Sequence, residues 1–272
     1  MQKIYFFWAW VFGRSIFYKL NKALFDLSLR GMGIFNYSNS SISGERWLIN
    51  NFVKKLGKDL VVFDIGANVG EYSKLVLDLG VEVKNIYAFE PHPNTFIRLK
   101  ENTSNISIVL PFQIALSDLS GELQLFDREG VVGSVHASLS ESIFTDIYKV
   151  GCSKRAVKVN TLDAFSSHNR INSIDLLKID VEGFELKVLQ GARIMLADRR
   201  VRMIQFEFTQ LNSTIGIFFK QIYDLLEKDY CIYRLLPHGV QRINFYNPTI
   251  CEIFGFQNFV AVLKTEGIGK SV

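Results

Sequence analysis

Short runs of β-branched and aromatic residues alternate with stretches of helical periodicity from residue 60 onward. The runs that we expect to be strands are residues 60–65, 85–89, 106–116, 121–126, 156–159, 174–180, 201–208, 231–235 and 258–263. Helices are expected over residues 69–79, 94–101, 184–197 and 215–228. Strands that alternate with helices are typical of a mostly parallel sheet with crossover connections. The pattern therefore predicts one α/β domain over residues 57–272.

Two segments depart from this alternation. Residues 128–156 are interrupted by glycine and serine, and connections of this length are typical of lids or substrate loops. Residues 1–56 look helical and are expected to form an N-terminal cap.

The cap begins with an apolar run, residues 4–12, which is about half the length that a membrane span needs. Arg14 and Lys19 follow it closely. Residues 13–15, Gly-Arg-Ser, make a poor signal-peptide cleavage site. Residues 1–22 are therefore interpreted in two ways. They form an interfacial helix on a bilayer, or they pack on the main domain or on a second subunit as a homodimer contact. In either case a cytoplasmic protein is expected, at most peripheral to the membrane.

Composition narrows the function classes. The net charge of +4 is a small difference between 31 basic and 27 acidic residues. This balance gives no sign of the dense basic stripe that a nucleic-acid partner would require. The three cysteines are widely spaced and form no disulfide framework, which fits reduced thiols in the cytosol.

The most informative polar residues surround a turn at residues 64–70, between an expected buried strand and a helix. Gly66 removes the Cβ that would block a sharp bend, and Gly70 lets the helix lie close to the sheet. Backbone N–H groups at such a helix start face a polar or anionic ligand. The alternative interpretation is that Gly66 and Gly70 form an ordinary tight turn that binds no ligand.

Two carboxylates follow at the ends of the next strands. Glu90, followed by Pro91, stands about twenty residues beyond the turn, where a carboxylate accepts both hydroxyls of a ribose. Asp118, preceded by Ser117, is positioned to accept from the exocyclic amine of adenine. The alternatives are a favourable acid beside a helix start for Glu90 and a turn residue for Asp118.

The turn chemistry favours a methyl donor over a dinucleotide. Asn68 stands where a backbone would have to approach a pyrophosphate, and the Asp64 carboxylate would repel one. The same carboxylate suits the cationic methionine end of S-adenosylmethionine, directly or through water. A nucleotide-dependent oxidoreductase and a non-catalytic, membrane-associated protein that keeps the fold remain as alternatives. The expected cofactor-binding residues are Asp64, Gly66, Asn68, Gly70, Glu90, Pro91, Ser117 and Asp118.

Together these motifs resemble the FkbM family of methyltransferases over about residues 60–210. The resemblance rests on VFDIGANVG (62–70), FEPHP (89–93), ALSD (115–118), VNTLD (159–163), LKIDVEGFE (177–185) and LQGA (189–192). It implies a class I methyltransferase, Rossmann-like fold with a mostly parallel seven-stranded sheet and helices on both faces. It also implies S-adenosylmethionine as donor and usually a hydroxyl of a sugar, glycan precursor or secondary metabolite as acceptor.

Methyl transfer to an alcohol benefits from a base near the acceptor oxygen. Asp180 and Glu182 follow an expected strand at the sheet edge where ligands bind. We expect Asp180 to orient or deprotonate the acceptor, with Glu182 second and His136 reaching in from the irregular loop. The alternative for the two acids is stabilisation of a helix N-terminus. Glu207 is a third acid at this edge, and three acids are enough for a divalent cation, although none is predicted.

Overall fold

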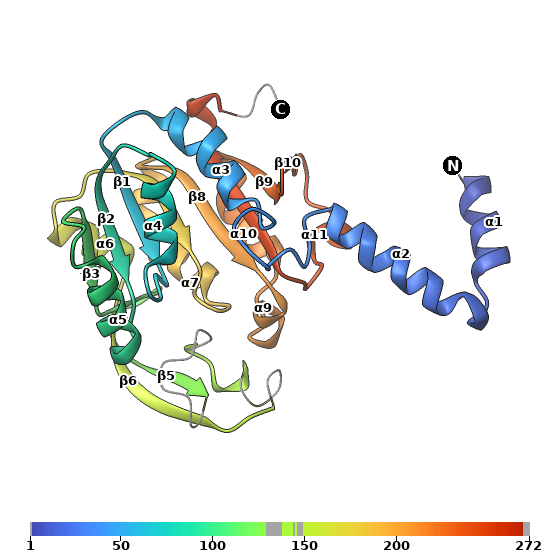
Figure 1. The fold of residues 1–272 in the computed structure, drawn as a ribbon, viewed down its shortest axis with the longest axis horizontal. Coiled ribbons are helices and arrows are strands. Elements are labelled where there is room, and N and C mark those ends of the chain that lie inside the picture. Colours follow the sequence, from blue (N-terminus) through green and yellow to red (C-terminus); the bar gives the residue numbers. More distant parts are fainter. Residues whose placement is uncertain (1, 129–137, 144, 146–148, 269–272) are drawn as a thin grey trace.

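The computed structural model describes residues 2–128, 138–143, 145 and 149–268, and within them eight strands form one main sheet (Figure 1). The strand order is β10-β9-β11-β8-β7-β1-β2-β3, and β3, β2, β1, β7 and β8 are parallel neighbours. The bounds are β1 Leu60–Ile65, β2 Val83–Phe89, β3 Val109–Phe112, β7 Ile174–Ile179, β8 Val201–Phe208, β9 Tyr230–Leu236, β10 Gly239–Arg242 and β11 Gln257–Leu263. Strand β11 runs antiparallel to both of its neighbours. The predicted mostly parallel α/β architecture is confirmed.

The sheet has eight strands where the family resemblance implied seven. The additional strand, β10, folds back on β9 through a turn at Pro237 and His238 and pairs with it in antiparallel register. Its four residues are half-buried or exposed, so no apolar alternation marked it in the sequence.

The expected strand at residues 106–116 divides between two sheets. Its first part is β3, at the edge of the main sheet, where Pro111 is tolerated because an edge strand has a free side. Its second part, β4 (Ala115–Leu116), joins a smaller sheet of order β4-β6-β5 with β5 (Gly121–Arg128) and β6 (Cys152–Asn160). This second sheet lies beside the carboxyl ends of the main strands (Figure 1).

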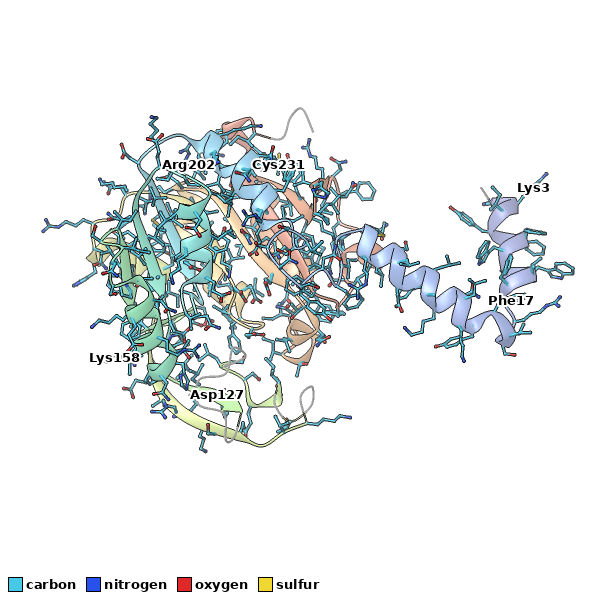
Figure 2. The ribbon with its side chains drawn as sticks, in the orientation of Figure 1. Lys3, Phe17, Asp127, Lys158, Arg202 and Cys231 are labelled. Atoms are coloured by element: carbon cyan, nitrogen blue, oxygen red, sulfur yellow. The ribbon has the colours of Figure 1, made fainter. Side chains whose placement is uncertain are left out.

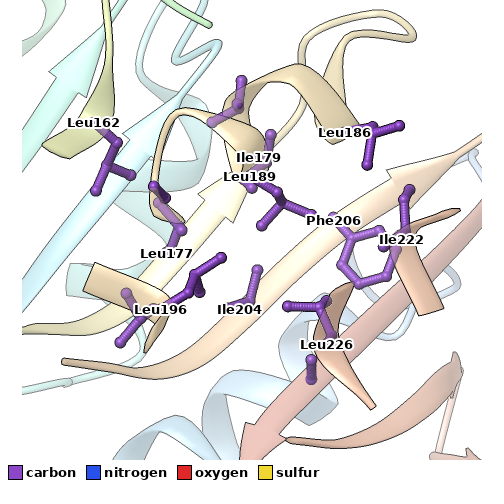
Figure 3. Close-up of a cluster of buried hydrophobic side chains, with 14 of the residues drawn as sticks. Leu162, Leu177, Ile179, Leu186, Leu189, Leu196, Ile204, Phe206, Ile222 and Leu226 are labelled. Carbon is purple, nitrogen blue, oxygen red and sulfur yellow. The ribbon is translucent and has the colours of Figure 1, made fainter. Parts of the chain in front are cut away.

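Helices cover both faces of the main sheet. One face packs on α3 (Glu45–Asn51), α4 (Glu71–Asp78) and α5 (Pro93–Thr103), and the other on α6 (Leu162–His168), α7 (Glu185–Gln190), α8 (Arg193–Ala197) and α10 (Phe219–Leu226). Alternate strand residues supply the two cores, so Val62 belongs to the first and Phe63 to the second. Figure 3 shows the second core, where strand residues such as Leu177 and Phe206 meet helix residues such as Leu189 and Ile222.

The expected helix at residues 184–197 is broken into α7 and α8 at Gly191. A Cβ there would lie 2.0 Å from the backbone oxygen of Ser117, so only glycine allows this junction to pack against the end of β4. The expected helix at 215–228 begins later, as α10, and a separate short helix, α9 (Gln210–Thr214), precedes it. A last short helix, α11 (Pro248–Cys251), precedes β11.

The N-terminal residues divide into a packed part and a projecting part. Helix α3 and the 3-10 helix η2 (Val53–Leu56) bury Leu48, Phe52 and Val53 against the sheet. By contrast α1 (Gln2–Phe12), the 3-10 helix η1 (Ser15–Phe17) and α2 (Tyr18–Gly31) extend away from the body (Figure 1). Among the described residues, no helix combines the length and apolar character needed to cross a membrane.

The turn after β1 brings the backbone of Gly66 close to the end of β7. Gly66 has a φ of +78°, and a Cβ on it would lie 1.8 Å from the backbone oxygen of Asp180, at the end of β7. The adjacent hydrogen bond from the Asp180 N–H to the Ile65 oxygen, 3.0 Å, holds the two strand ends together. This position therefore needs glycine for both its backbone conformation and its packing.

We predict that Gly66→Ala lowers the free energy of unfolding by at least about 3 kcal/mol, because backbone strain and a backbone clash add. Gly80 is the matched control: its φ is +75°, but nothing lies within 4 Å of its missing Cβ. Gly80→Ala is expected to cost only about 1 kcal/mol. Urea unfolding of both variants measures the difference, and equal losses would show that the close approach to Asp180 is unimportant.

Candidate active site

A cavity of about 840 Å³ opens at the carboxyl ends of β1, β2, β7 and β8. Most of the predicted site residues line it: Gly66, Asn68, Glu90, Pro91, Asp180, Glu182 and Glu207. A second cavity of about 680 Å³ adjoins it and shares Gly66, Asn68, Glu71, Asp180 and Glu207. The smaller sheet forms one wall, through Leu116 of β4 and Leu125 of β5. Parallel strands bring these distant residues together because their carboxyl ends share one edge.

Glu90 is held rigidly at the tip of β2. Its Oε1 accepts from the His92 N–H at 2.8 Å, and its Oε2 accepts from the Asn68 N–H at 3.1 Å. Burial raises the pKa of Glu90 to about 7, although both hydrogen bonds favour the ionised form. Each carboxylate oxygen keeps a lone pair for a further donor. The glycine turn and the β2 tip are thus connected directly through this side chain.

Asp64 lies beneath the cavity and is absent from its lining. The side chain is fully buried, and its Oδ2 accepts from the Ser73 hydroxyl at 2.7 Å. Its Oδ1 has no hydrogen-bond partner among the described residues. Burial raises the pKa of this carboxyl. The structure therefore places Asp64 beneath the site, outside the lining of both cavities.

Lys178 is buried at the centre of a group of carboxylates. Its ammonium lies below the main cavity, 2.8 Å from the Oδ2 of Asp180 and 5.2 Å from the ring centroid of Tyr72 in α4. Burial alone would lower its pKa, but the carboxylates of Asp180, Asp64 and Glu45 outweigh this and raise the pKa of Lys178 above its ordinary value. The sequence signal was its spacing, since residues 178 and 180 of a strand share one face.

Hydrogen-bonded side chains connect Lys178 and its carboxylates to the N-terminal part of the fold. The Tyr72 hydroxyl donates to Gln205 at 2.7 Å, and the Gln205 amide donates to Glu45 at 3.0 Å. Ser43 donates to the other oxygen of Glu45 at 3.0 Å. Helices α3 and α4 are thereby tied to β8 directly beneath the site.

Three acids face the cavity at the ends of β7 and β8. The Asp180 side chain is 32% exposed, so its carboxylate is available from the cavity although Lys178 holds it from below. Glu182 sits in the turn after β7 with a φ of +52°, and its backbone oxygen accepts from Ser138 at 3.1 Å. Burial, together with the charge of Asp180, raises the pKa of Glu207. No group of three or more acidic, histidine or cysteine side chains in the described chain is arranged to hold a metal ion.

Ser117 and Asp118 do not line the cavity. Asp118 accepts from the Lys187 ammonium at 2.8 Å and from the Ser117 hydroxyl at 3.1 Å. Partial burial opposes ionisation, but the hydrogen bonds from Lys187 and Ser117 together with the Lys187 charge outweigh it and lower the pKa of Asp118. Gly70 also stays outside the lining and begins α4 with a φ of +89°. His136 lies outside the described residues.

Sequence reasoning missed an aromatic part of the lining. Phe35 and Tyr37 follow α2, and Phe256 precedes β11, yet all three line the main cavity. The Phe35 N–H donates to the Phe256 oxygen at 2.8 Å, which joins the two segments. No spacing along the chain marks residues that meet only through such a long-range contact.

Comparison with known proteins gives a consistent picture. The profile of the methyltransferase FkbM domain matches residues 64–235, more than half of the chain. The hexuronic acid methyltransferase AglP of Haloferax volcanii is 28% identical over 55% of this chain and 57% of its own length, so less than two thirds of that relative is covered. The 2-O-methyltransferase NoeI of Sinorhizobium fredii is 28% identical over 74% of this chain and 84% of its own. The crystal structure of a methyltransferase FkbM from Methylobacillus flagellatus aligns with 75% of this chain and 43% of its own, with a TM-score of 0.48 and 12% identity.

We predict that Lys178→Met lowers the free energy of unfolding by about 3–5 kcal/mol, because it leaves several buried carboxylates without their cation. Lys187→Met is the control, since the Lys187–Asp118 pair has the same 2.8 Å separation but a lysine side chain that is 41% exposed. Loss of this ion pair should lower the free energy of unfolding by less than about 1 kcal/mol. Chemical denaturation of the two variants is the measurement, and similar costs would argue against a structural role for the buried cation.

Proposed function

The chain belongs to the FkbM family of S-adenosylmethionine-dependent methyltransferases, and we propose that it transfers the donor's methyl group to a hydroxyl oxygen of a sugar or sugar-containing precursor. Family membership removes the oxidoreductase alternative. The observation that carries the proposal is the cavity that contains both the Glu90 carboxylate and the acids after β7 and β8.

The cavity suits the donor in charge and shape. The rigid, buried carboxylate of Glu90 is suited to accept two ribose hydroxyls, and the Gly66 turn presents no side chain there. The donor supplies an electrophilic methyl group on a positively charged sulfur, and the Asp180 carboxylate favours that charge. Gly66, Asn68, Glu90 and Pro91 form the proposed donor-binding set.

The other four residues of the expected donor set are left out of the proposed one. Asp64 and Gly70 support the turn from outside the cavity lining. Asp118 is omitted because its carboxylate is already paired with Lys187, and Ser117 is omitted with it.

Asp180 is the proposed residue that orients the acceptor hydroxyl and receives its proton. Lys178 donates to one of its oxygens from below at 2.8 Å, which leaves the other oxygen for the acceptor. Glu182 is the second candidate because it lines the same cavity from the following turn.

The charge of the lining also bears on the acceptor. The described residues that line the main cavity include Glu71, Glu90, Asp180, Glu182 and Glu207 but no lysine or arginine. A carboxylate on the acceptor would be repelled there, by roughly 1–2 kcal/mol per nearby charge at an intermediate dielectric. We therefore propose a neutral sugar, in contrast to the hexuronic acid in the name of the Haloferax relative.

Binding of S-adenosylhomocysteine is predicted to weaken about tenfold between pH 8 and pH 6. A carboxyl with a raised pKa of about 7 is mostly ionised at pH 8 and mostly protonated at pH 6, and only the ionised form accepts from both hydroxyls. Glu90→Gln should bind roughly tenfold to a hundredfold more weakly at pH 8 and lose this pH dependence. Calorimetry at the two pH values is the measurement.

Glu185 provides the matched control for this titration. Burial raises its pKa to about 7 as well, but it contacts Asn212 and backbone N–H groups outside the cavity lining. Glu185→Gln should therefore keep the pH dependence of the parent protein. If the parent binds equally well at both pH values, Glu90 is not the residue that binds the ribose.

Asp180→Asn is predicted to keep S-adenosylhomocysteine affinity within about twofold and to lower kcat by about a hundredfold, because an amide cannot accept the proton. The assay follows labelled methyl transfer from S-adenosylmethionine to a panel of pyranosides, each neutral sugar paired with its hexuronic acid. Neutral members should be methylated at least about tenfold faster than their partners. Donor binding without methylation of any sugar would reject the acceptor proposal alone.

A further inference from the structure

The projecting segment, residues 2–31, stands apart from the rest of the molecule. It comprises α1, η1 and α2, which lead away from the body at an angle to each other (Figure 1). None of the residues of α1, Gln2–Phe12, is buried, and in α2 only Leu29, at the base, is. Figure 2 shows side chains of this segment, between Lys3 and Phe17, that point into solvent. The expectation that this helix packs on the main domain is therefore wrong.

Large apolar side chains concentrate on this segment. Of the 20 exposed large hydrophobic residues in the described chain, 12 belong to it: Ile4, Tyr5, Phe6, Phe7, Trp8, Trp10, Ile16, Tyr18, Leu20, Leu24, Phe25 and Leu27. Phe6 and Trp10 are 76% and 67% exposed. A contiguous apolar surface of this kind marks a site of interaction with a partner or a membrane.

The segment also carries the whole net charge of the protein. Its five basic residues, Lys3, Arg14, Lys19, Lys22 and Arg30, face one acid, Asp26, which gives it a net charge of +4. The chain has 31 basic and 27 acidic residues in total, so the remaining 26 of each sign cancel. The segment that exposes these aromatic side chains is thus also the part that accounts for the net positive charge of the chain.

We propose that the projecting segment binds the surface of an anionic phospholipid bilayer. Apolar side chains of α1 and α2 would enter the boundary between headgroups and acyl chains, with tryptophan and tyrosine at the headgroup level. Arg14 and Lys19, beside the apolar run, would lie near lipid phosphates. The body, with no net charge outside this segment, would remain in the aqueous phase.

The net charge of the projecting segment favours an anionic bilayer over a second copy of the chain as its binding partner. A symmetric helix contact would bring two segments of net charge +4 together, and like charges at an interface oppose association. An anionic lipid surface attracts the same residues, by a factor of about five for each basic side chain near it.

Vesicle sedimentation of the full-length protein tests this proposal. The parent should bind vesicles that contain about a third phosphatidylglycerol at least tenfold more tightly than vesicles of phosphatidylcholine alone. Arg14→Gln with Lys19→Gln should weaken binding to the anionic vesicles by about tenfold or more. Phe6→Ser with Trp10→Ser should weaken it by at least tenfold on either lipid, because the apolar contribution is lost.

Two double variants elsewhere on the surface serve as controls. Lys154→Gln with Lys158→Gln removes the same charge from β6, and Ile194→Ser with Phe245→Ser removes exposed apolar side chains from the body. Both should bind within about twofold of the parent. The proposal would be overturned if the parent protein does not bind anionic vesicles. It would also fail if the segment variants keep full vesicle binding but abolish a dimer in sedimentation equilibrium, since the surface would then belong to a second copy.

Discussion

The ammonium of Lys178 is the interaction on which the site depends. It is buried among carboxylates from β1, α3 and the turn after β7, and its charge offsets the repulsion between these acids. The cluster holds Asp180 at the cavity wall, and through Glu45 and Gln205 it is continuous with the packing of α3 and α4. Buried charges without a partner are costly, so the structural support and the chemistry of the site cannot be separated.

The same electrostatics bears on both ligands of the proposed reaction. A lining rich in carboxylates suits a donor with a positive sulfur and is unsuited to an acceptor with a carboxylate of its own. The projecting segment has the opposite charge and stands away from the body. If both proposals hold, the acidic site and the basic segment would keep donor binding and attachment to a membrane physically independent.

Much of the architecture follows from local pattern. The β1 turn, the tip of β2 and the acids after β7 were all predicted at the sheet edge, because parallel strands with crossover helices place successive strand ends side by side. Elements without a local signal were predicted incompletely. Strand β10 is short and half-exposed, and the break between α7 and α8 depends on how closely Gly191 approaches Ser117, a contact between distant segments.

What the sequence by itself determined is the fold class and the set of polar residues that gather at one edge, since periodicity and glycine placement act locally. Only the tertiary structure decided which of those residues face the cavity. It buried Asp64, paired Asp118 with Lys187, turned Lys178 inward and brought Phe35 and Phe256 together. The physical reason is that exposure and charge pairing depend on neighbours far away in the chain, which spacing along one strand does not specify.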